Sequence, residues 1–495
     1  MNNFDSSLLN FFTLNSLTSL LFTLNSLTLY FLLLTLNFSI FMTICSISTA
    51  PGIGAIALVR VSGPQAFDIV GTLIPDGDRF AEWPARTAHF CRLYDGQQLV
   101  DEVVVVKYAS PHSYDGEDMV EISCHGSRYI QQKILQLLLR GGCRLAERGE
   151  FTLRAFMNGK MDLPQAEAVA DLIDSQSESA HRLAVNQLKG GVSRTIADLR
   201  DRFIQLAALL ELELDFSEED VEFADRKKFM QLLAELREEV QRLVASFHSG
   251  NALKNGIPVA IVGKPNVGKS TLLNALLDDD RAIVSDIPGT TRDTIEDTLS
   301  VGGTLFRIID TAGIRQSADT IESSGIQRSF RAMEKADVIL YLVDAGDTPD
   351  DIAAELRSLP AEVNLSGKRT ILIINKIDCK PVDTESFAKL EFDEVLAVSA
   401  KKRQHVGDVG DALSRYAEAC AAGDNTLLTN ARHYDLMCGI AADITRIEEG
   451  FAMGVPTDLV AIDVRSALDK LGQLTGTITD NDILNTVFGK FCIGK

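Results

Sequence analysis

The sequence predicts a multidomain α/β and α+β protein. In it, a P-loop domain (parallel sheet with flanking helices) is inserted in a helical domain and preceded by an α+β domain. The 495 residues exceed one ordinary domain and suggest about three. Short apolar runs alternate with helical patterns across residues 256–420, and apolar residues at helical spacing occupy the flanks 161–255 and 421–495. Residues 42–160 mix strand and helix patterns.

The first 41 residues differ from the rest of the chain. They carry almost no charge, and FTLNSLTSLL is followed directly by FTLNSLTLYF, a repeat of ten residues. A membrane helix needs about 20 mostly apolar residues, and Asn, Ser and Thr interrupt the apolar stretch 29–34 on both sides. The basic region that begins a signal peptide is also missing. We interpret residues 1–41 as a low-complexity extension that is not native, with Met42 as the true first residue.

The composition restricts the classes of function. The chain holds 48 Lys+Arg against 69 Asp+Glu, a formal net charge of −21. General nucleic-acid binding depends on Lys and Arg contacts to phosphates, so any RNA contact should use a local basic patch or a partner. The 8 cysteines include no C-x-x-C pair, which argues against a zinc knuckle and a secreted disulfide scaffold and for a reducing cytoplasm.

The α+β domain is predicted from its β-branched runs and one helical stretch. Residues 56–61 and 103–108 are short and mostly apolar, as strands are. Residues 130–140 have a helical pattern that ends at Gly141-Gly142.

Two helices are predicted in the first flank from apolar residues three and four apart. Their stripes are Ile196, Leu199, Phe203, Leu206 and Leu210, and then Phe229, Leu233, Leu236, Val240 and Leu243. The last flank is helical again, as in Leu468-x-x-Leu471-x-x-Leu474. The sequence alone does not prove that the two flanks pack together.

Five short, nearly continuous apolar runs predict the strands of a buried parallel sheet with helices on both faces. They lie at residues 259–262, 305–309, 338–343, 371–374 and 395–398, each before a polar loop.

A P-loop follows the first of these strands. Residues 263–270 fit G-x-x-x-x-G-K-[ST] between a strand and a helix. The glycines let backbone N–H groups surround the β-phosphate, Lys269 would neutralise β/γ charge, and the Ser270 hydroxyl would bind Mg²⁺. The candidate phosphate-binding residues are Asn266, Val267, Gly268, Lys269, Ser270 and Thr271.

Recognition of a guanine base is predicted from a second motif, Asn375-Lys376-Ile377-Asp378, which follows another strand. Asp378 would accept hydrogen bonds from the guanine N1–H and exocyclic amine, and adenine lacks this pair of donors. Ser399-Ala400-Lys401 follows the next strand and would contact the base with main-chain amides. Together with the P-loop, these motifs predict GTP binding.

Two further motifs complete a switchable site. Asp310-Thr311-Ala312-Gly313 ends a strand, so that Asp310 would hold Mg²⁺ through water and Gly313 would sense the γ-phosphate. Thr290 and Thr291 lie upstream of this motif, at the sequence separation expected for the threonine of switch I. Many signalling GTPases place Gln after this Gly to orient the attacking water, but here the position holds Ile314. Another polar group must therefore assist hydrolysis, and the candidates are a cation bound beside the phosphates and the carboxylate of Glu322 further along the chain.

These motifs and their flanks resemble the bacterial tRNA-modification GTPase family MnmE, also called TrmE. The resemblance covers essentially all of residues 42–495. It is carried by Thr43-Ile44-Cys45, Gly149-Glu150-Phe151-Thr152, Gln165-Ala166-Glu167-Ala168 and the terminal Phe491-Cys492-Ile493-Gly494-Lys495.

The resemblance implies a homodimer formed through the N-terminal domains, residues 42–160, which bind 5-formyl-tetrahydrofolate as a one-carbon donor. By position, the family's folate contacts correspond to Arg60, Glu121, Lys160 and Lys495. From the residues alone these four are ordinary surface charges.

The resemblance also implies a potassium-activated GTPase. Potassium would be held by Asn266 with oxygens of Ser285, Ile287 and Thr290, and magnesium by Ser270 and Thr291. The K⁺ charge near the phosphates would stabilise the transition state. The family's water-orienting carboxylate corresponds to Glu322, and Arg315 would help to order switch II.

In the family the full reaction needs an FAD-containing partner, MnmG (GidA), in a heterotetramer. Together they add a carboxymethylaminomethyl or aminomethyl group to carbon 5 of the wobble uridine of certain tRNAs. Cys492 occupies the place of the family's terminal cysteine, and both a chemical role and a buried structural role stay open. The resemblance implies a cytoplasmic protein with no stable membrane association.

Two other classes of function share such a G domain. A ribosome-assembly or other non-modifying regulatory GTPase would carry a basic RNA-binding appendage, whereas this chain is acidic. A membrane-anchored transport GTPase would need many more apolar spans. Neither accounts for the terminal segment 491–495.

Overall fold

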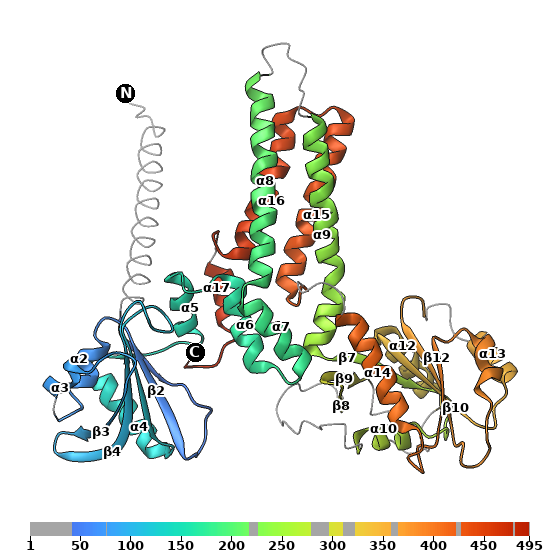
Figure 1. Ribbon diagram of the computed structural model, residues 1–495, viewed down its shortest axis with the longest axis horizontal. Helices are drawn as coiled ribbons and strands as arrows, with labels where there is room; N and C mark the ends of the chain where they lie inside the picture. Colours follow the sequence, from blue (N-terminus) through green and yellow to red (C-terminus); the bar gives the residue numbers. More distant parts are fainter. Residues whose placement is uncertain are drawn as a thin grey trace, which may run out of the picture. The chain divides into compact units, whose positions relative to one another are not determined.

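The computed structural model describes residues 42–75, 77–216, 226–278, 297–309, 322–357, 365–421, 427–478 and 481–494 (Figure 1). The chain forms two compact units. The first ends at Asp162 and includes the last segment from Thr479 onward, whereas the second spans Leu163–Ile478. These units divide the chain at other points than the predicted domain boundaries, which stay predictions.

The first unit is built on a six-stranded sheet with strand order β3-β4-β5-β2-β1-β6. Its strands pair antiparallel, except that β6 pairs parallel with β1. The strands are β1 (Ile44–Ile47), β2 (Ile56–Ser62), β3 (Ala88–Asp95), β4 (Gln98–Tyr108), β5 (Met119–His125) and β6 (Arg144–Leu145). The helices are α2 (Ala66–Gly71), α3 (Gly77–Glu82), α4 (Arg128–Arg140), α5 (Glu150–Met157) and α17 (Asn481–Phe488).

Alternation along the strands explains how this sheet buries one face. In β4, Val103 and Val105 are almost fully buried and Val104 between them is exposed, because successive side chains of a strand point to opposite faces. The predicted strand 56–61 and the predicted helix 130–140 are confirmed as β2 and α4. The predicted strand 103–108 is the second half of β4.

The helical part of the second unit comes from both flanks of the P-loop domain. Its helices are α6 (Leu163–Asp174), α7 (Glu178–Leu188), α8 (Gly191–Phe216), α9 (Arg226–Asn255), α15 (Ala431–Met453) and α16 (Thr457–Thr475). Buried apolar residues of α8, α9, α15 and α16 form one continuous core. Both predicted stripes lie in this core, in α8 and α9. The two flanks therefore do pack together, and these four long helices lie side by side (Figure 1).

The P-loop domain is built on a sheet with strand order β12-β11-β10-β7-β9-β8. The strands are β7 (Ile257–Val262), β8 (Asp297–Val301), β9 (Thr304–Ile308), β10 (Val338–Asp344), β11 (Arg369–Asn375) and β12 (Glu394–Val398). On one face of the sheet pack α10 (Lys269–Leu277) and α14 (Val406–Ala421). The other face is covered by α12 (Glu322–Lys335), α13 (Pro349–Arg357) and the 3-10 helix η1 (Thr384–Leu390).

The sheet departs from the prediction at one edge. All five predicted strands are present and parallel, but β8 is an additional, antiparallel partner of β9. Its sequence Asp-Thr-Leu-Ser-Val buries only Leu299 and Val301, as expected for an edge strand, so it has no continuous apolar run. In the part of the chain that is described, no helix is long and apolar enough to cross a membrane.

Candidate functional site

The P-loop leaves β7 and enters α10 through two glycines that no other residue could replace. Gly263 has φ 144°, and a Cβ there would lie 2.1 Å from the carbonyl oxygen of Leu342. Gly268 has φ 104°, and its Cβ would lie 2.3 Å from Nδ2 of Asn375. Asn266 also adopts a left-handed φ of 65°, which Asn tolerates better than most residues. The loop therefore has the tight curvature that brings backbone amides toward a phosphate.

Lys269 lies over this loop. Its Nζ donates hydrogen bonds to the carbonyl oxygens of Gly263 and Lys264, each at 2.7 Å. Burial lowers the pKa of the ammonium, and Glu355 opposes this shift. Ser270 and Thr271 follow in the first turn of α10 and are exposed. The free N–H groups of this helix N-terminus and the ammonium form a cationic site suited to phosphate oxygens.

Asn375 joins the P-loop to the predicted guanine motifs. Its side chain is buried at the end of β11. Nδ2 donates to the carbonyl oxygen of Val267 at 2.7 Å, while Oδ1 accepts from the backbone N–H of Ala400 at 3.0 Å. One side chain thus connects the phosphate loop with the Ser399-Ala400-Lys401 loop.

Asp378 is held in a defined orientation. The hydroxyl of Ser399 donates to its Oδ1 at 2.6 Å, and the backbone N–H of Lys402 donates to that hydroxyl at 3.2 Å. The Ser399 hydrogen bond is the main cause that lowers the pKa of Asp378. An oriented, ionised carboxylate is what a pair of N–H donors on guanine requires.

Two ion pairs at this site were not predicted. Lys376 Nζ lies 2.6 Å from Oδ2 of Asp344, which ends β10. Lys264 of the P-loop lies 3.3 Å from Glu355 on α13. Asp344 directly follows the apolar run 338–343. A polar residue at the end of a buried strand is a site candidate, as Asp378 is after its own strand, so the sequence could have indicated Asp344 too. Glu355 belongs to a helix with no motif, and nothing in its sequence indicates the contact.

The described residues bring two groups of predicted nucleotide contacts together at the carboxyl ends of β7, β11 and β12. These are Asn266, Val267, Gly268, Lys269, Ser270 and Thr271, with Asn375, Lys376, Asp378, Ser399, Ala400 and Lys401. Glu322 is the first residue of α12, and the description does not extend to its side chain. The other predicted switch residues lie outside the described residues: Ser285, Ile287, Thr290, Thr291, Asp310, Thr311, Ala312, Gly313, Ile314 and Arg315.

A second candidate site lies in the first unit, around Arg60 and Glu121. These residues face each other on β2 and β5, and their side chains form an ion pair at 2.7 Å. The guanidinium carbon lies 5.1 Å from the ring centroid of Tyr114 and 5.5 Å from that of Phe151. Tyr108 donates to Glu121 at 3.3 Å. The result is a mostly buried ion pair whose guanidinium lies beside two aromatic rings.

Lys160 lies near the same site. Its Nζ donates to the carbonyl oxygen of Pro111 at 2.9 Å, in the loop 109–118 that also carries Tyr114. Lys495 lies outside the described residues. The carbonyl oxygen of the preceding Gly494 accepts from Ser48 at 2.9 Å, just beyond β1. The fold thus groups Arg60, Glu121 and Lys160 around one loop, although they are far apart in sequence.

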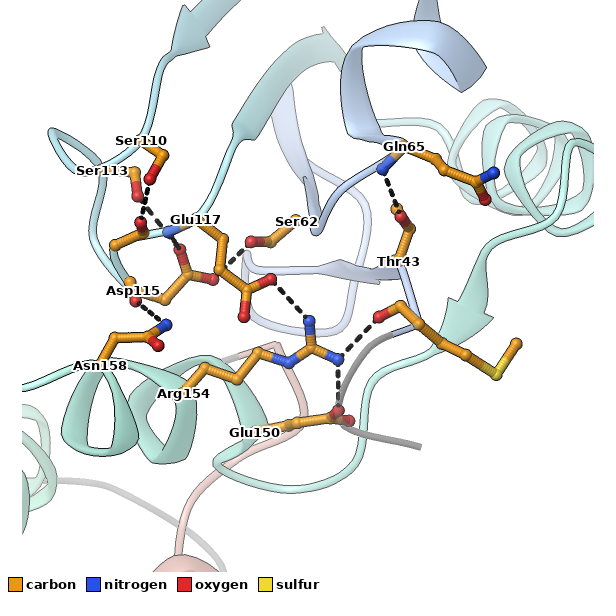
Figure 2. A network of polar contacts seen from close by, with 12 residues as sticks. Thr43, Ser62, Gln65, Ser110, Ser113, Asp115, Glu117, Glu150, Arg154 and Asn158 are labelled. Carbon is orange, nitrogen blue, oxygen red and sulfur yellow. Dashed lines mark hydrogen bonds and ion pairs between the residues drawn. The ribbon is translucent and has the colours of Figure 1, made fainter. Parts of the chain in front are cut away.

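A buried polar network anchors this loop (Figure 2). Arg154 of α5 forms ion pairs with Glu117 at 2.9 Å and Glu150 at 3.0 Å. Asp115 is fully buried and accepts from the Ser62 hydroxyl. Burial raises the pKa of Glu117, and the charge of Arg154 opposes this shift. Arg154 was not predicted from the sequence, although it lies two positions after Gly149-Glu150-Phe151-Thr152.

Asn158 closes the network from the end of α5. Its Nδ2 donates to the carbonyl oxygen of Asp115 at 2.8 Å (Figure 2). The loop that carries Tyr114 and Pro111 is therefore fixed to β2 on one side and to α5 on the other.

Cys492 is exposed, although both of its neighbours in sequence are held in place. Phe491 is buried, and Ile493 forms a β-bridge with Arg148. Within this single chain the thiol of Cys492 is therefore accessible, while the flanking residues anchor the segment. Its role stays a prediction.

Comparison with known proteins covers both units. The family description "GTP-binding protein TrmE N-terminus" matches residues 43–160, and "MnmE helical domain" matches residues 163–492. The tRNA modification GTPase MnmE of Christiangramia forsetii is 46% identical over 470 residues, which is 92% of this chain and 99% of that protein. The chain belongs to the MnmE family of tRNA modification GTPases. The MnmE proteins of Flavobacterium psychrophilum and Bacteroides fragilis are 47% and 45% identical, again over 92% of this chain and 99% of each relative.

The chain is also similar to solved structures of GTP-binding proteins. Era in complex with MgGDPNP and a segment of 16S ribosomal RNA is 27% identical and covers 37% of this chain and 65% of that chain, with a TM-score of 0.25. The G domain of FeoB from Methanococcus jannaschii is 26% identical and covers 32% and 96%, with a TM-score of 0.23.

Membership of the MnmE family defines the activity. The chain is a GTPase that acts in tRNA modification, and it binds GTP through its G domain. The match extends over both flanks of the G domain, so the ribosome-assembly and transport alternatives do not hold.

Proposed function

We propose that this GTPase is activated by potassium. With MnmG (GidA), it would add a carboxymethylaminomethyl or aminomethyl group to carbon 5 of the wobble uridine of certain tRNAs. The one-carbon unit would come from 5-formyl-tetrahydrofolate. The observation that carries the nucleotide part is Asn375, whose two hydrogen bonds join the phosphate loop to the guanine loop. A rigid connection of this kind lets one site recognise base and phosphates together.

The proposed cation sites use the P-loop and switch I. Magnesium would be held by Ser270 and Thr291, and potassium by Asn266 with Ser285, Ile287 and Thr290. The exposed Asn266 at the tip of the loop supports this assignment, since its amide oxygen is available to a cation. A potassium ion would supply positive charge beside the phosphates, and Glu322 would orient the attacking water.

The proposed folate site is the surface around Arg60, Glu121 and Lys160, with Lys495. Because Glu121 already neutralises Arg60, net positive charge for an anionic ligand would come from Lys160 and Lys495. The guanidinium and rings of Tyr114 and Phe151 suit a flat pterin. The anchored loop 109–118 supports a preformed pocket wall.

We further propose a homodimer through residues 42–160, a heterotetramer with MnmG, and a cytoplasmic location. All 8 cysteines are free, which supports a reducing compartment. Cys492 is proposed to act in the modification chemistry, since its thiol is accessible.

The decisive experiment is mass analysis of wobble uridines in tRNA from cells that lack this protein. Restoring the full chain should restore the modified uridines, whereas the Asp378→Asn chain should not. Unmodified uridines in cells that carry the full chain would refute the proposed reaction.

The potassium assignment is tested separately on the purified chain. GTP hydrolysis should fall sharply when Na⁺ replaces K⁺ at constant ionic strength. Equal rates in the two salts would remove Asn266 from the cation site without affecting the proposed reaction.

A further inference from the structure

The β8–β9 hairpin connects the two predicted switch segments. β8 begins at Asp297, directly after the segment that contains Thr290 and Thr291, and β9 ends at Ile308, just before Asp310. β9 runs parallel to β7, whose carboxyl end carries the P-loop. The turn of the hairpin therefore lies at the opposite end of the sheet from the phosphates. Five residues of strand span roughly 17 Å, so a shift of this hairpin would carry a signal over that distance.

The turn itself has no room for side chains. Gly302 and Gly303 have φ 57° and 75°, the left-handed pair that a two-residue hairpin turn requires. A Cβ on Gly302 would lie 2.7 Å from the hydroxyl of Ser414 on α14. A Cβ on Gly303 would lie 2.9 Å from the carboxylate of Glu178 on α7. Two helices thus contact the turn, one from the G domain and one from the helical domain.

The contact with the helical domain is a hydrogen-bonded joint. The backbone N–H of Ser179 donates to the carbonyl oxygen of Gly303 at 3.0 Å. The hydroxyls of Ser179 and Thr304 lie 2.7 Å apart, and both residues are buried. Ser179 is in the first turn of α7, so the hairpin carbonyl satisfies an amide that the helix itself leaves free. Ser177, the N-cap residue, satisfies the amide of Ala180 at 3.2 Å.

The helix that receives this contact leads into the rest of the helical domain. α7 packs against α6, α8 and α9. A pocket of about 430 Å³ lies beside the joint, lined by Ser179, Arg182, Thr304 and Glu418 among others. The hairpin is therefore bonded to α7 on one side and has open space on another, which allows it to move together with the helix.

We propose that the buried Ser179–Thr304 hydroxyl pair is the joint through which the nucleotide state of the G domain reaches the helical domain. The inference rests on the proposed GTP-dependent switches at both ends of the hairpin. Ser179 and Thr304 are positioning residues, since neither is near the phosphates. A movement of the segment before β8 or of the segment after β9 would displace the attached strand, and the hairpin turn would pass this displacement to the N-terminus of α7.

Hydrogen exchange on the full chain tests the joint. Backbone amides of α7 are compared with GDP and with a non-hydrolysable GTP analogue. In the unaltered chain their exchange rates should differ between the two states by about five-fold, the lower end of typical allosteric coupling. Thr304→Val, which keeps the shape and removes the hydroxyl, should bring this ratio close to one. Thr304→Ser, which keeps the hydroxyl, should retain it.

Two further variants complete the design. Ser193→Ala removes a buried hydroxyl of α8 that has no hydrogen-bond partner among the described residues, so it should retain the ratio. If Thr304→Val does not fold, Ser179→Ala combined with Thr304→Val leaves no unpaired hydroxyl and gives the same test. A ratio that persists in the folded valine variant, or is absent in the unaltered chain, overturns the joint. GTP affinity measured on the same samples would reveal a failure of nucleotide binding independently.

Discussion

At the residue scale, Asn375 and Asp378 show how few side chains organise the proposed guanine site. Asn375 bonds to partners 108 and 25 positions away in sequence. Asp378 depends on Ser399, which lies 21 positions away on the next strand end. These contacts form because parallel strands end at the same edge of a sheet, which brings their following loops together.

Asp378→Asn tests guanine recognition. Replacing one carboxylate oxygen by an amide removes a charged acceptor of the guanine N–H groups, so GTP affinity should fall about 100-fold. Xanthosine triphosphate should bind better than before, because its exchanged donor and acceptor match the amide. Competition binding with both nucleotides measures the change. An unaltered preference for GTP would mean that Asp378 does not contact the base.

Glu322→Ala tests the proposed catalytic carboxylate. The change should lower kcat about 100-fold, the usual contribution of a positioned base, and leave GTP affinity nearly unchanged. Single-turnover hydrolysis and equilibrium binding separate the two quantities. Glu334→Ala, on the same helix α12, serves as the matched control and should keep normal turnover. A normal kcat for Glu322→Ala would exclude this residue from the mechanism.

At the scale of elements, a buried ion pair connects the two halves of the helical domain. Glu167 of α6 lies 2.6 Å from His433 and 2.9 Å from Arg432, both at the start of α15. Burial raises the pKa of Glu167, but His433 and Arg432 outweigh it and bring the value to about 2. In the sequence, Glu167 stands out only as part of a family signature, since Arg432, its partner 265 positions away, has no local signal.

Glu167→Gln tests this pair through its pH dependence. The pKa of Glu167 in the folded chain lies below its ordinary value of 4.5. The ion pair therefore contributes its full stabilisation of the folded state above pH 4.5, and this contribution is lost as the pH falls toward 2. The variant should lose about 3 kcal/mol of stability at pH 7, because Arg432 loses its largely buried counter-charge. Between pH 4.5 and pH 2, the midpoint of urea unfolding should therefore change less in the variant than in the unaltered chain.

The control for this prediction is Asp174→Asn, at the exposed end of the same helix. It should leave both the midpoint and its pH dependence unchanged. An unaltered pH profile in Glu167→Gln would show that the ion pair does not contribute to stability.

At the scale of the whole molecule, the matched family description and the matched relatives cover most of the chain. The N-terminal description starts at residue 43, and the curated relatives are covered almost completely by 92% of this chain. The two compact units each have their own sheet or helical core.

Deletion of residues 1–41 tests the interpretation of the N-terminal extension. The shortened chain should keep its GTPase rate and its yield in the soluble fraction, because all the predicted site residues lie after Met42. Turnover assays and the soluble fraction after expression measure both. Loss of folding or a changed location in the cell would contradict it.

The sequence by itself determined that the chain is a GTPase, because each nucleotide-binding motif is a short local pattern at the end of a strand. It also determined the buried stripes of α8 and α9, since helical spacing is a local property. The tertiary structure alone decided the edge strand β8, the anchoring of the 109–118 loop by Arg154, and the joint of Ser179 with Thr304. These features depend on contacts between residues far apart in sequence. Each depends on which surfaces pack together, and no local pattern encodes that.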